Sequence, residues 1–168
     1  MTRIDFLLVT VGTTGFDELV EAVDGVVGRL DVRDGLIQYG PGRHVPRSLP
    51  SERFVPSLDP YYDKATLVIA HGGAGTALEV VGRGIPLVGV ANDDRYDHHQ
   101  DDVLGALSAA RHLVWCRDLS RLEEAVTEAM AGDLVPLPRE PCGIADLVDR
   151  HLAGLPTGRR LRLPWRWR

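Results

Sequence analysis

Short runs of consecutive apolar residues alternate along this chain with segments whose apolar residues recur at helical spacing. Asp5–Val11 is such a run and is rich in β-branched residues, and Thr66–Gly72 and Pro86–Ala91 are two more. A strand that is apolar on both sides must be covered on both faces, which is typical of a parallel sheet. The alternation of these strands with helices predicts an α/β fold, a Rossmann-like doubly wound parallel sheet with right-handed crossovers.

The other elements follow from the same periodicities. Helices are expected at Phe16–Leu30, Thr76–Arg83, His99–Ala110, Leu119–Ala131 and Ile144–Leu155, with a single helical turn at Tyr61–Ala65. Further strands are expected at Leu36–Gly40 and His112–Cys116, with a brief one at Arg53–Val55. Prolines recur through residues 41–60, so most of that stretch is predicted to be loop.

Charge is unevenly distributed along the chain. The last ten residues, RRLRLPWRWR, hold five arginines, and the rest carries 14 basic against 24 acidic residues. An acidic body argues against nucleic acid as a partner, because nucleic-acid binding requires a basic face. We expect one domain over residues 1–155 and a basic, tryptophan-containing tail over residues 156–168. That tail either contacts an anionic membrane surface or a partner protein, or is a solvated end.

The cysteines and the first residues bear on the compartment. Cys116 and Cys142 lie far apart without CxxC spacing, so they predict neither a disulfide framework nor a zinc site and suit a reducing compartment. The first apolar run is interrupted by Gly12 too early for a signal peptide, and no run approaches the ~18 apolar residues of a spanning helix. We therefore expect a cytoplasmic protein, with peripheral contact at the inner face of the membrane left open.

Glycines gather where one predicted strand passes into a helix, in the segment VIAHGGAGTALEVV, Val68–Val81. Free backbone N–H groups and a helix N-terminus at the carboxyl edge of a parallel sheet favour an anion. Thr76 adds a hydroxyl donor, and Glu79 follows one helical turn later, within reach of the two hydroxyls of a ribose. A simpler interpretation is that the glycines only permit a tight strand-to-helix turn, and the glycine cluster by itself does not decide between the two.

Other nucleotide-binding motifs are missing from the sequence. The chain has no GxxxxGK[ST] segment, which argues against a P-loop and against a kinase or phosphatase. Leu78 occupies the position of the third glycine of a dinucleotide motif, and the strand at Leu36–Gly40 does not end in a ribose-binding acid. NAD binding is therefore not expected.

Two segments resemble a known family. HGGAGTALEVVGRGIPLVGV (His71–Val90), followed by DHHQ (Asp97–Gln100), is similar to the donor-nucleotide motif of GT-B glycosyltransferases, specifically the family 28 C-terminal domain. The opening VTVGTTGFDELVEAV (Val9–Val23) resembles the small catalytic subunits of two-part UDP-N-acetylglucosamine transferases and their bacterial exopolysaccharide counterparts. The resemblance covers Phe6–Val126 and implies the fold of the C-terminal half of a GT-B enzyme.

What the resemblance implies about activity is specific. It implies a subunit that takes N-acetylglucosamine or another hexose from a UDP-sugar and transfers it to a lipid-linked glycan or exopolysaccharide acceptor. It also implies a membrane-anchored partner subunit that binds the acceptor. The alternative is a non-catalytic nucleotide-sugar-binding or regulatory module, which would need the same glycines and the same Glu79.

The resemblance assigns residues of this sequence to the donor site. Donor nucleotide contacts fall on Thr13, Thr14, His71, Gly72, Gly73, Ala74, Gly75, Thr76 and Glu79. Donor sugar contacts fall on Asn92, His99 and Gln100. Within this set, Gly72–Thr76 would hold the diphosphate and Glu79 the ribose. His71 is either a general base or a strand-end histidine that hydrogen-bonds to phosphate or backbone, and no other residue stands out as catalytic.

The acidic loop near residue 97 raises the question of a metal ion. Its candidate ligands are Asp94, Asp97, His98, His99, Asp101 and Asp102. Adjacent residues point apart and the His-x3-His spacing of helical metal sites is missing, so no metal is expected. No cofactor is expected besides the UDP-sugar donor itself.

Overall fold

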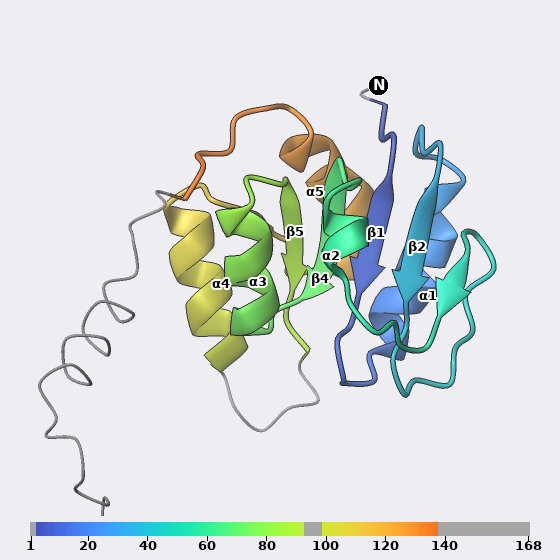
Figure 1. Cartoon of the computed structure of the whole chain (residues 1–168). Helices are drawn as coiled ribbons and strands as arrows, with labels where there is room; N and C mark the ends of the chain where they lie inside the picture. The colour runs from blue at the N-terminus through green and yellow to red at the C-terminus, as the bar shows by residue number, and fades with distance from the viewer. Residues whose placement is uncertain (1–2, 93–98, 138–168) are drawn as a thin grey trace, which may run out of the picture. The chain divides into compact units, whose positions relative to one another are not determined.

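The computed structural model describes residues 3–92 and 99–137, and Figure 1 shows how their elements are arranged. They belong to a compact unit that ends at Pro138. The described strands form one six-stranded sheet in the order β3-β2-β1-β4-β5-β6, and every neighbouring pair is parallel. The strands are β1 (Leu7–Thr10), β2 (Gly35–Gln38), β3 (Ser51–Glu52), β4 (Leu67–His71), β5 (Leu87–Val90) and β6 (Val114–Trp115).

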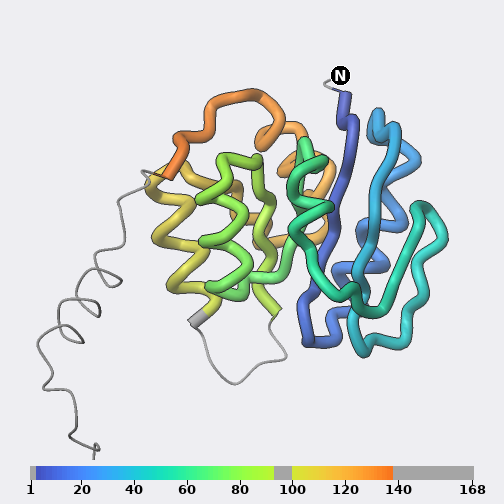
Figure 2. Tube along the Cα trace, viewed as in Figure 1, coloured from blue at the N-terminus to red at the C-terminus, as the bar shows by residue number. Residues whose placement is uncertain are grey.

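Helices cover both faces of the sheet, as Figures 1 and 2 show. One face carries α1 (Asp17–Val27) and α5 (Leu122–Ala129), and the other carries α2 (Asp59–Tyr62), α3 (Ala74–Gly82) and α4 (His99–Ala109). Successive strand residues point to opposite faces. In β1, accordingly, Leu7 and Val9 pack with α1 and α5, whereas Leu8 packs with the other three helices. The predicted doubly wound parallel sheet is confirmed.

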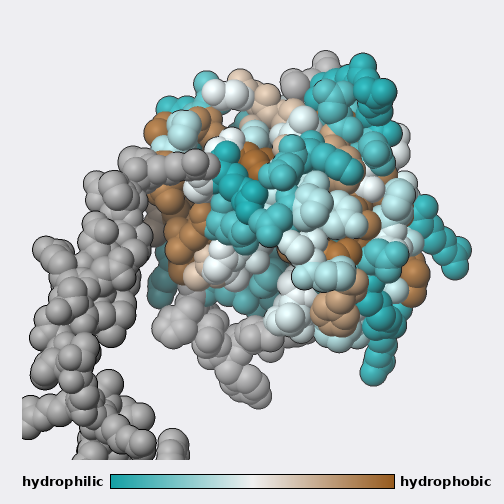
Figure 3. Space-filling view, in the orientation of Figure 1, coloured by the Kyte–Doolittle hydropathy of each residue, from teal (hydrophilic) through white to brown (hydrophobic). Residues whose placement is uncertain are grey.

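Helix α1 forms because its sequence is amphipathic and its first turn is acidic. Asp17 and Glu18 lie in that turn, where negative charge interacts favourably with the helix dipole. The residues that it buries against the sheet are Leu19, Val20, Val23, Val26 and Val27. In the orientation of Figure 1, Figure 3 shows the opposite, α2–α4 face, where hydrophilic residues dominate the middle and hydrophobic residues gather near α4. Among the described residues, no helix has the length and apolar character that a membrane span requires.

Two short elements differ from the sequence-based predictions. The brief strand is Ser51–Glu52 rather than Arg53–Val55, because the ladder with β2 begins where the N–H of Ile37 donates to Pro50. The helical turn is Asp59–Tyr62 rather than Tyr61–Ala65. Pro60 fits the first turn of that helix, because the N–H that proline lacks has no partner there.

Other boundaries shift by a turn or less. Helix α3 begins at Ala74, two residues before the predicted start, and α1 ends at Val27. The predicted helix Leu119–Ala131 is divided into a 3₁₀ turn, η1 (Leu119–Arg121), and α5, because the side chain of Asp118 accepts a hydrogen bond from Ser120 N and begins a tight turn. The predicted helix Ile144–Leu155, the domain boundary at residue 155 and the tail lie outside the described residues.

Two carboxylates of α1 hold the proline-rich loop that precedes β3. Asp17 accepts hydrogen bonds from the backbone N–H groups of Arg43 and His44. Asp24 accepts from the N–H groups of Arg47 and Ser48, and its Oδ2 lies 3.0 Å from Nε2 of the His44 ring. Burial raises the pKa of Asp24, but hydrogen bonds from Ser48, His44 and Arg47 outweigh it and hold the pKa at about 2.

This arrangement predicts how stability depends on pH. Because the pKa of Asp24 is lower in the folded protein than in an unfolded chain, its contribution is complete above pH ~4 and is lost as the pH falls toward 2. The shift corresponds to about 2 kcal/mol of unfolding free energy. Urea denaturation between pH 5 and pH 2 should show that the unfolding free energy of Asp24→Asn falls less steeply with decreasing pH than that of the wild type. Equal slopes would contradict the assignment.

Candidate functional site

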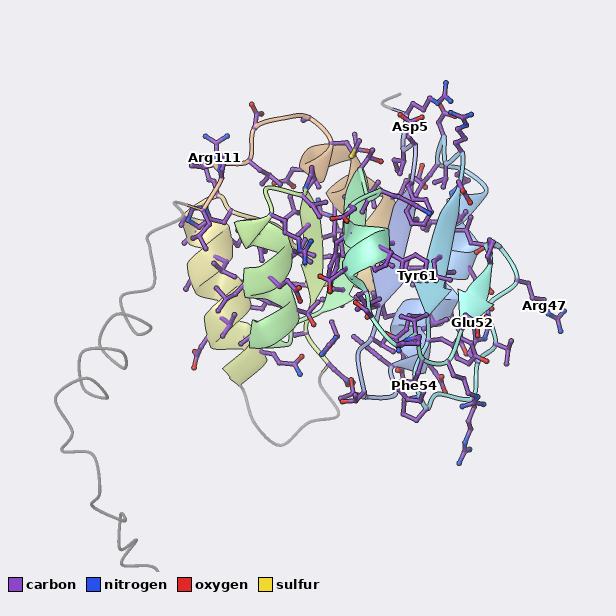
Figure 4. All side chains as sticks on the ribbon, in the orientation of Figure 1. Asp5, Arg47, Glu52, Phe54, Tyr61 and Arg111 are labelled. Carbon is purple, nitrogen blue, oxygen red and sulfur yellow. The ribbon has the colours of Figure 1, made fainter. Side chains whose placement is uncertain are left out.

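The strand order reverses between β1 and β4. From β1 the chain continues outward to β2 and β3, and from β4 it continues in the opposite direction to β5 and β6. In open sheets of this kind, ligands bind outside the carboxyl ends of the strands at this reversal. The loops after β1 and after β4 leave the same edge of the sheet, as Figure 1 shows. Phe54, which follows β3 and is 53% exposed, also lies toward this edge, whereas Asp5 and Arg111 lie at the opposite one (Figure 4).

Three glycines at this edge are explained by close packing. A Cβ atom on Gly73 would lie 2.5 Å from Nε2 of His71, and one on Gly12 would lie 2.8 Å from Cε1 of the same ring. The imidazole of His71 is 9% exposed and therefore lies between the two loops, in contact with both. Gly72 makes room for α4 instead, because its Cβ would lie 2.8 Å from Cδ1 of Leu104. Gly72 and Gly73 of the glycine cluster are thus needed for close packing, which agrees with the interpretation that the glycines permit a tight strand-to-helix turn.

Gly75 has no such packing reason. Nothing lies within 4 Å of a Cβ placed on it, and both Gly75 and Ala74 are exposed. The N–H groups of Ala74, Gly75 and Thr76 are the first three of α3, and the described part of the chain supplies no acceptor for them. The N-cap residue is Gly73, which has no side chain to cap the helix. Three backbone donors and the positive end of a helix dipole therefore face open space at the reversal of strand order.

The N–H groups of the two preceding glycines are already used. Gly72 N donates to Val90 O at 2.7 Å, and Gly73 N donates to His71 O at 2.8 Å. Of the predicted diphosphate-binding segment Gly72–Thr76, the last three residues are thus the ones whose backbone donors remain available.

Gln38 is a residue of this edge that the sequence analysis did not assign to the site. It ends β2 and is 3% exposed. Its Oε1 accepts hydrogen bonds from Thr10 Oγ1 at 2.5 Å and from Gly12 N at 3.1 Å. Its Nε2 donates to Gly12 O at 2.8 Å and to Arg53 O at 2.7 Å. One side chain thereby fixes the loop after β1 to the segment after β3, and the signal for it was a lone polar residue in an apolar strand.

Two of the predicted sugar-binding residues lie together at the carboxyl end of β5. Gln100 Oε1 accepts a hydrogen bond from Asn92 N at 3.0 Å. Nδ2 of Asn92 donates to Gly15 O at 3.1 Å, so the asparagine also ties this end of β5 to the loop after β1. A Cβ on Gly72 would lie 3.2 Å from Oε1 of Gln100, which places the glutamine beside the glycine junction. His99 begins α4, and its side chain lies outside the described residues.

The two threonines after β1 differ from each other. The hydroxyl of Thr14 donates to Val11 O at 2.9 Å and closes the turn. Thr13 is exposed in the same loop. Of the pair, Thr14 thus uses its hydroxyl within the turn, whereas Thr13 is the exposed one.

Glu79 lies on the exposed side of α3, one helical turn after Gly75. Its side chain is 46% exposed, and its Oε1 lies 3.2 Å from Nη2 of Arg83. Arg83 in turn pairs with Asp59 and Asp63 of the α2 region. The carboxylate is therefore held by a residue that lies one helical turn further along the chain.

The carboxyl end of β6 lies further along the same edge of the sheet. Two cavities, of about 220 and 260 Å³, open near the carboxyl end of β6 and share Trp115, Cys116 and Arg117. Burial raises the pKa of the Cys116 thiol, which argues against a reactive thiolate there. Within residues 3–92 and 99–137, no group of three or more His, Cys, Asp or Glu residues is placed to hold a metal ion. Asp94, Asp97 and His98 lie outside the described residues.

Comparison with known proteins decides the family. The sequence model of the glycosyltransferase family 28 C-terminal domain matches residues 6–150. The chain belongs to this family. The human UDP-N-acetylglucosamine transferase subunit ALG13 (Homo sapiens) is 35% identical over 122 residues, which make up 66% of this chain and 11% of the human protein. This family 28 domain thus spans about a tenth of the length of that relative.

Solved structures agree with the family assignment at the level of the fold. The crystal structure of MurG from Acinetobacter baumannii superimposes with a TM-score of 0.61 at 22% identity, covering 77% of this chain and 42% of MurG. The NMR structure of ALG13 has a TM-score of 0.58 at 17% identity, covering 87% of this chain and 94% of that one. The predicted equivalence to one half of a GT-B glycosyltransferase and the resemblance to the small transferase subunits are confirmed.

Proposed function

We propose that this chain is the donor-binding subunit of a UDP-sugar-dependent glycosyltransferase. It transfers N-acetylglucosamine, or another hexose, to a lipid-linked glycan or exopolysaccharide acceptor. The observation that carries the proposal is the open N-terminus of α3 at the reversal of strand order, within the family's donor motif. The name of the human relative, a UDP-N-acetylglucosamine transferase subunit, supports the choice of sugar and of a two-part enzyme.

The diphosphate is bound by the N–H groups of Ala74, Gly75 and Thr76, together with the hydroxyl of Thr76. Open space at Gly75 lets the phosphate oxygens approach the backbone. During transfer, the bond from the anomeric carbon to the diphosphate oxygen breaks, and a bond to the acceptor oxygen forms. Negative charge grows on the leaving diphosphate, and fixed donors at a helix N-terminus stabilise it there without reorganisation.

The remaining residues orient the donor. Glu79 accepts hydrogen bonds from the ribose hydroxyls, and Asn92, His99 and Gln100 contact the sugar. Thr13 contacts the donor from the loop after β1, which Gln38 and Thr14 hold in place.

His71 is proposed to have a positioning role. Its ring lies between the backbones of Gly12 and Gly73, so it sets the distance between the two loops. That position favours a hydrogen-bonding and spacing role over the role of general base.

The acceptor site and the base that takes the acceptor's proton are proposed to come from a membrane-associated partner subunit. In this proposal the chain acts at the cytoplasmic face of the membrane, and the basic tail adds contact with anionic lipid or with the partner.

Calorimetric titration with UDP, UDP-N-acetylglucosamine, UDP-galactose and UDP-glucose tests the donor site. We expect UDP to bind and UDP-N-acetylglucosamine to bind most tightly among the sugars. Release of UDP from UDP-N-acetylglucosamine should require membranes of the native host, which supply the acceptor and the partner. Binding of none of the four would refute the proposal, and binding without any UDP release would identify a non-catalytic nucleotide-sugar-binding module.

A further inference from the structure

We propose that Arg83 is a positioning residue that holds the Glu79 carboxylate ready for the ribose, and that it thereby sets the preference for ribonucleotide over deoxyribonucleotide donors. The inference rests on the proposed function, because Glu79 has a ribose to bind only if the donor occupies the N-terminus of α3. Arg83 itself is assigned no contact with the substrate.

The guanidinium of Arg83 is anchored by two carboxylates besides Glu79, one of them through the same Nη2 that contacts Glu79. Nη1 lies 3.3 Å from Oδ1 of Asp63, and Nη2 pairs with Oδ1 of Asp59. The guanidinium carbon also lies 5.0 Å from the centre of the Tyr62 ring, which is buried at 3% exposure. These contacts join α2 to the end of α3 and hold the guanidinium in one place.

This anchor restricts a side chain that would otherwise be mobile. Glu79 is 46% exposed, and an exposed glutamate samples several rotamers that must be given up when it binds a ligand. Arg83 contacts only Oε1 of Glu79. The described residues leave Oε2 without a contact, so this oxygen is available to accept a ribose hydroxyl while the arginine fixes the other.

Charge acts in the same direction. Three carboxylates, those of Asp59, Asp63 and Glu79, surround the single guanidinium. Without the positive charge these carboxylates repel one another, and Glu79 turns away from α2. Lysine is expected to replace arginine poorly, because a single ammonium group cannot hold the planar, two-nitrogen arrangement seen here.

The test compares binding of UDP with binding of 2′-deoxy-UDP by calorimetry. For the wild type we expect UDP to bind about tenfold more tightly than 2′-deoxy-UDP, because one hydrogen bond to a charged group contributes about that much affinity. For Arg83→Met we expect affinity for UDP to fall about three- to fivefold, because Glu79 is then free in the unbound protein and must give up rotamers when it binds. Affinity for 2′-deoxy-UDP, which keeps only the 3′ hydroxyl, should fall less than affinity for UDP, and Arg83→Lys should lie between the wild type and Arg83→Met.

A matched control separates positioning from stability. Arg29 also pairs with a glutamate, Glu123, at 2.7 Å, but it is more exposed than Arg83 and lies on the opposite face of the sheet. Arg29→Met should lower the melting temperature about as Arg83→Met does and leave the ratio of UDP to 2′-deoxy-UDP affinity at its wild-type value.

The outcomes distinguish this inference from the proposed function. If Glu79→Ala removes the preference for UDP while Arg83→Met keeps it, the inference is overturned and the donor site stands. Equal losses for UDP and 2′-deoxy-UDP in Arg83→Met would show a structural role alone and overturn it as well. If the wild type binds UDP and 2′-deoxy-UDP equally, Glu79 makes no useful contact with the 2′ hydroxyl, and the role proposed for Arg83 is overturned.

Discussion

Gly75→Asp is expected to fold at least as well as the wild type and to lose more than about a hundredfold of its affinity for UDP. Nothing lies within 4 Å of the new Cβ, and Gly75 does not have a positive φ, so the backbone accepts aspartate without strain. Replacing a helical glycine and placing an acid in the first turn each stabilise α3, by up to about 1 kcal/mol.

The same carboxylate removes the anion site. It occupies the open space in front of the three free N–H groups and carries the charge of the diphosphate that we place there. Two unit charges 4 Å apart repel by about 4 kcal/mol at the effective dielectric constant of a near-surface site. Thermal melting and calorimetric titration measure the two effects separately. Gly75→Ala is the control, since it shares the gain in helix propensity but carries no charge, and it should lose less affinity for UDP than Gly75→Asp does. A Gly75→Asp protein that bound UDP normally would place the diphosphate elsewhere.

Gln38→Leu is expected to lower the unfolding free energy by about 3 kcal/mol or more. The substitution removes the partner of the Gly12 carbonyl and the acceptor of the Thr10 hydroxyl, whereas Gly12 N keeps Thr10 Oγ1 and Arg53 O keeps Gly40 N. Each buried polar group left without a partner costs about 1–3 kcal/mol. The loop after β1 should also move away from the His71 ring, so that affinity for UDP falls in the protein that remains folded.

Gln38→Glu provides a second variant of nearly the same size. Its carboxylate would face two carbonyl oxygens in a buried position, which raises its pKa and favours the protonated form. The stability of this variant should therefore rise as the pH is lowered from 7 toward 5, a trend that the wild type does not share. Urea denaturation across that range measures it, and a pH-independent Gln38→Glu protein would contradict the arrangement described for Gln38.

The sequence predicts most of the fold because the pattern of apolar residues is local. Runs such as Leu7–Thr10 and Leu87–Val90 are buried on both sides and short, and only a covered parallel sheet accommodates them. The short elements were placed less well. Ser51–Glu52 has no strand pattern of its own and is defined by hydrogen bonds to β2, which the sequence does not reveal.

The candidate site was predicted as a set of residues but not as a set of roles. The motif marks Gly72, Gly73 and Gly75 alike, whereas the structure separates the first two, which make room for neighbouring side chains, from Gly75. The contact between Gly12 and His71 joins residues from different loops, so no local pattern predicts it. The same is true of Gln38 and Arg83, whose partners lie on other elements.

The central claim is that the diphosphate binds at the N–H groups of Ala74, Gly75 and Thr76. A titration of the ¹⁵N-labelled chain with UDP, followed by two-dimensional amide spectra, tests it most directly, with uridine as the control that lacks phosphate. We predict that the largest phosphate-dependent shifts fall on these three amides, while those of Gly72 and Gly73, already bonded within the chain, change less. Shifts concentrated instead on residues 115–118, beside the cavities at β6, would contradict the account.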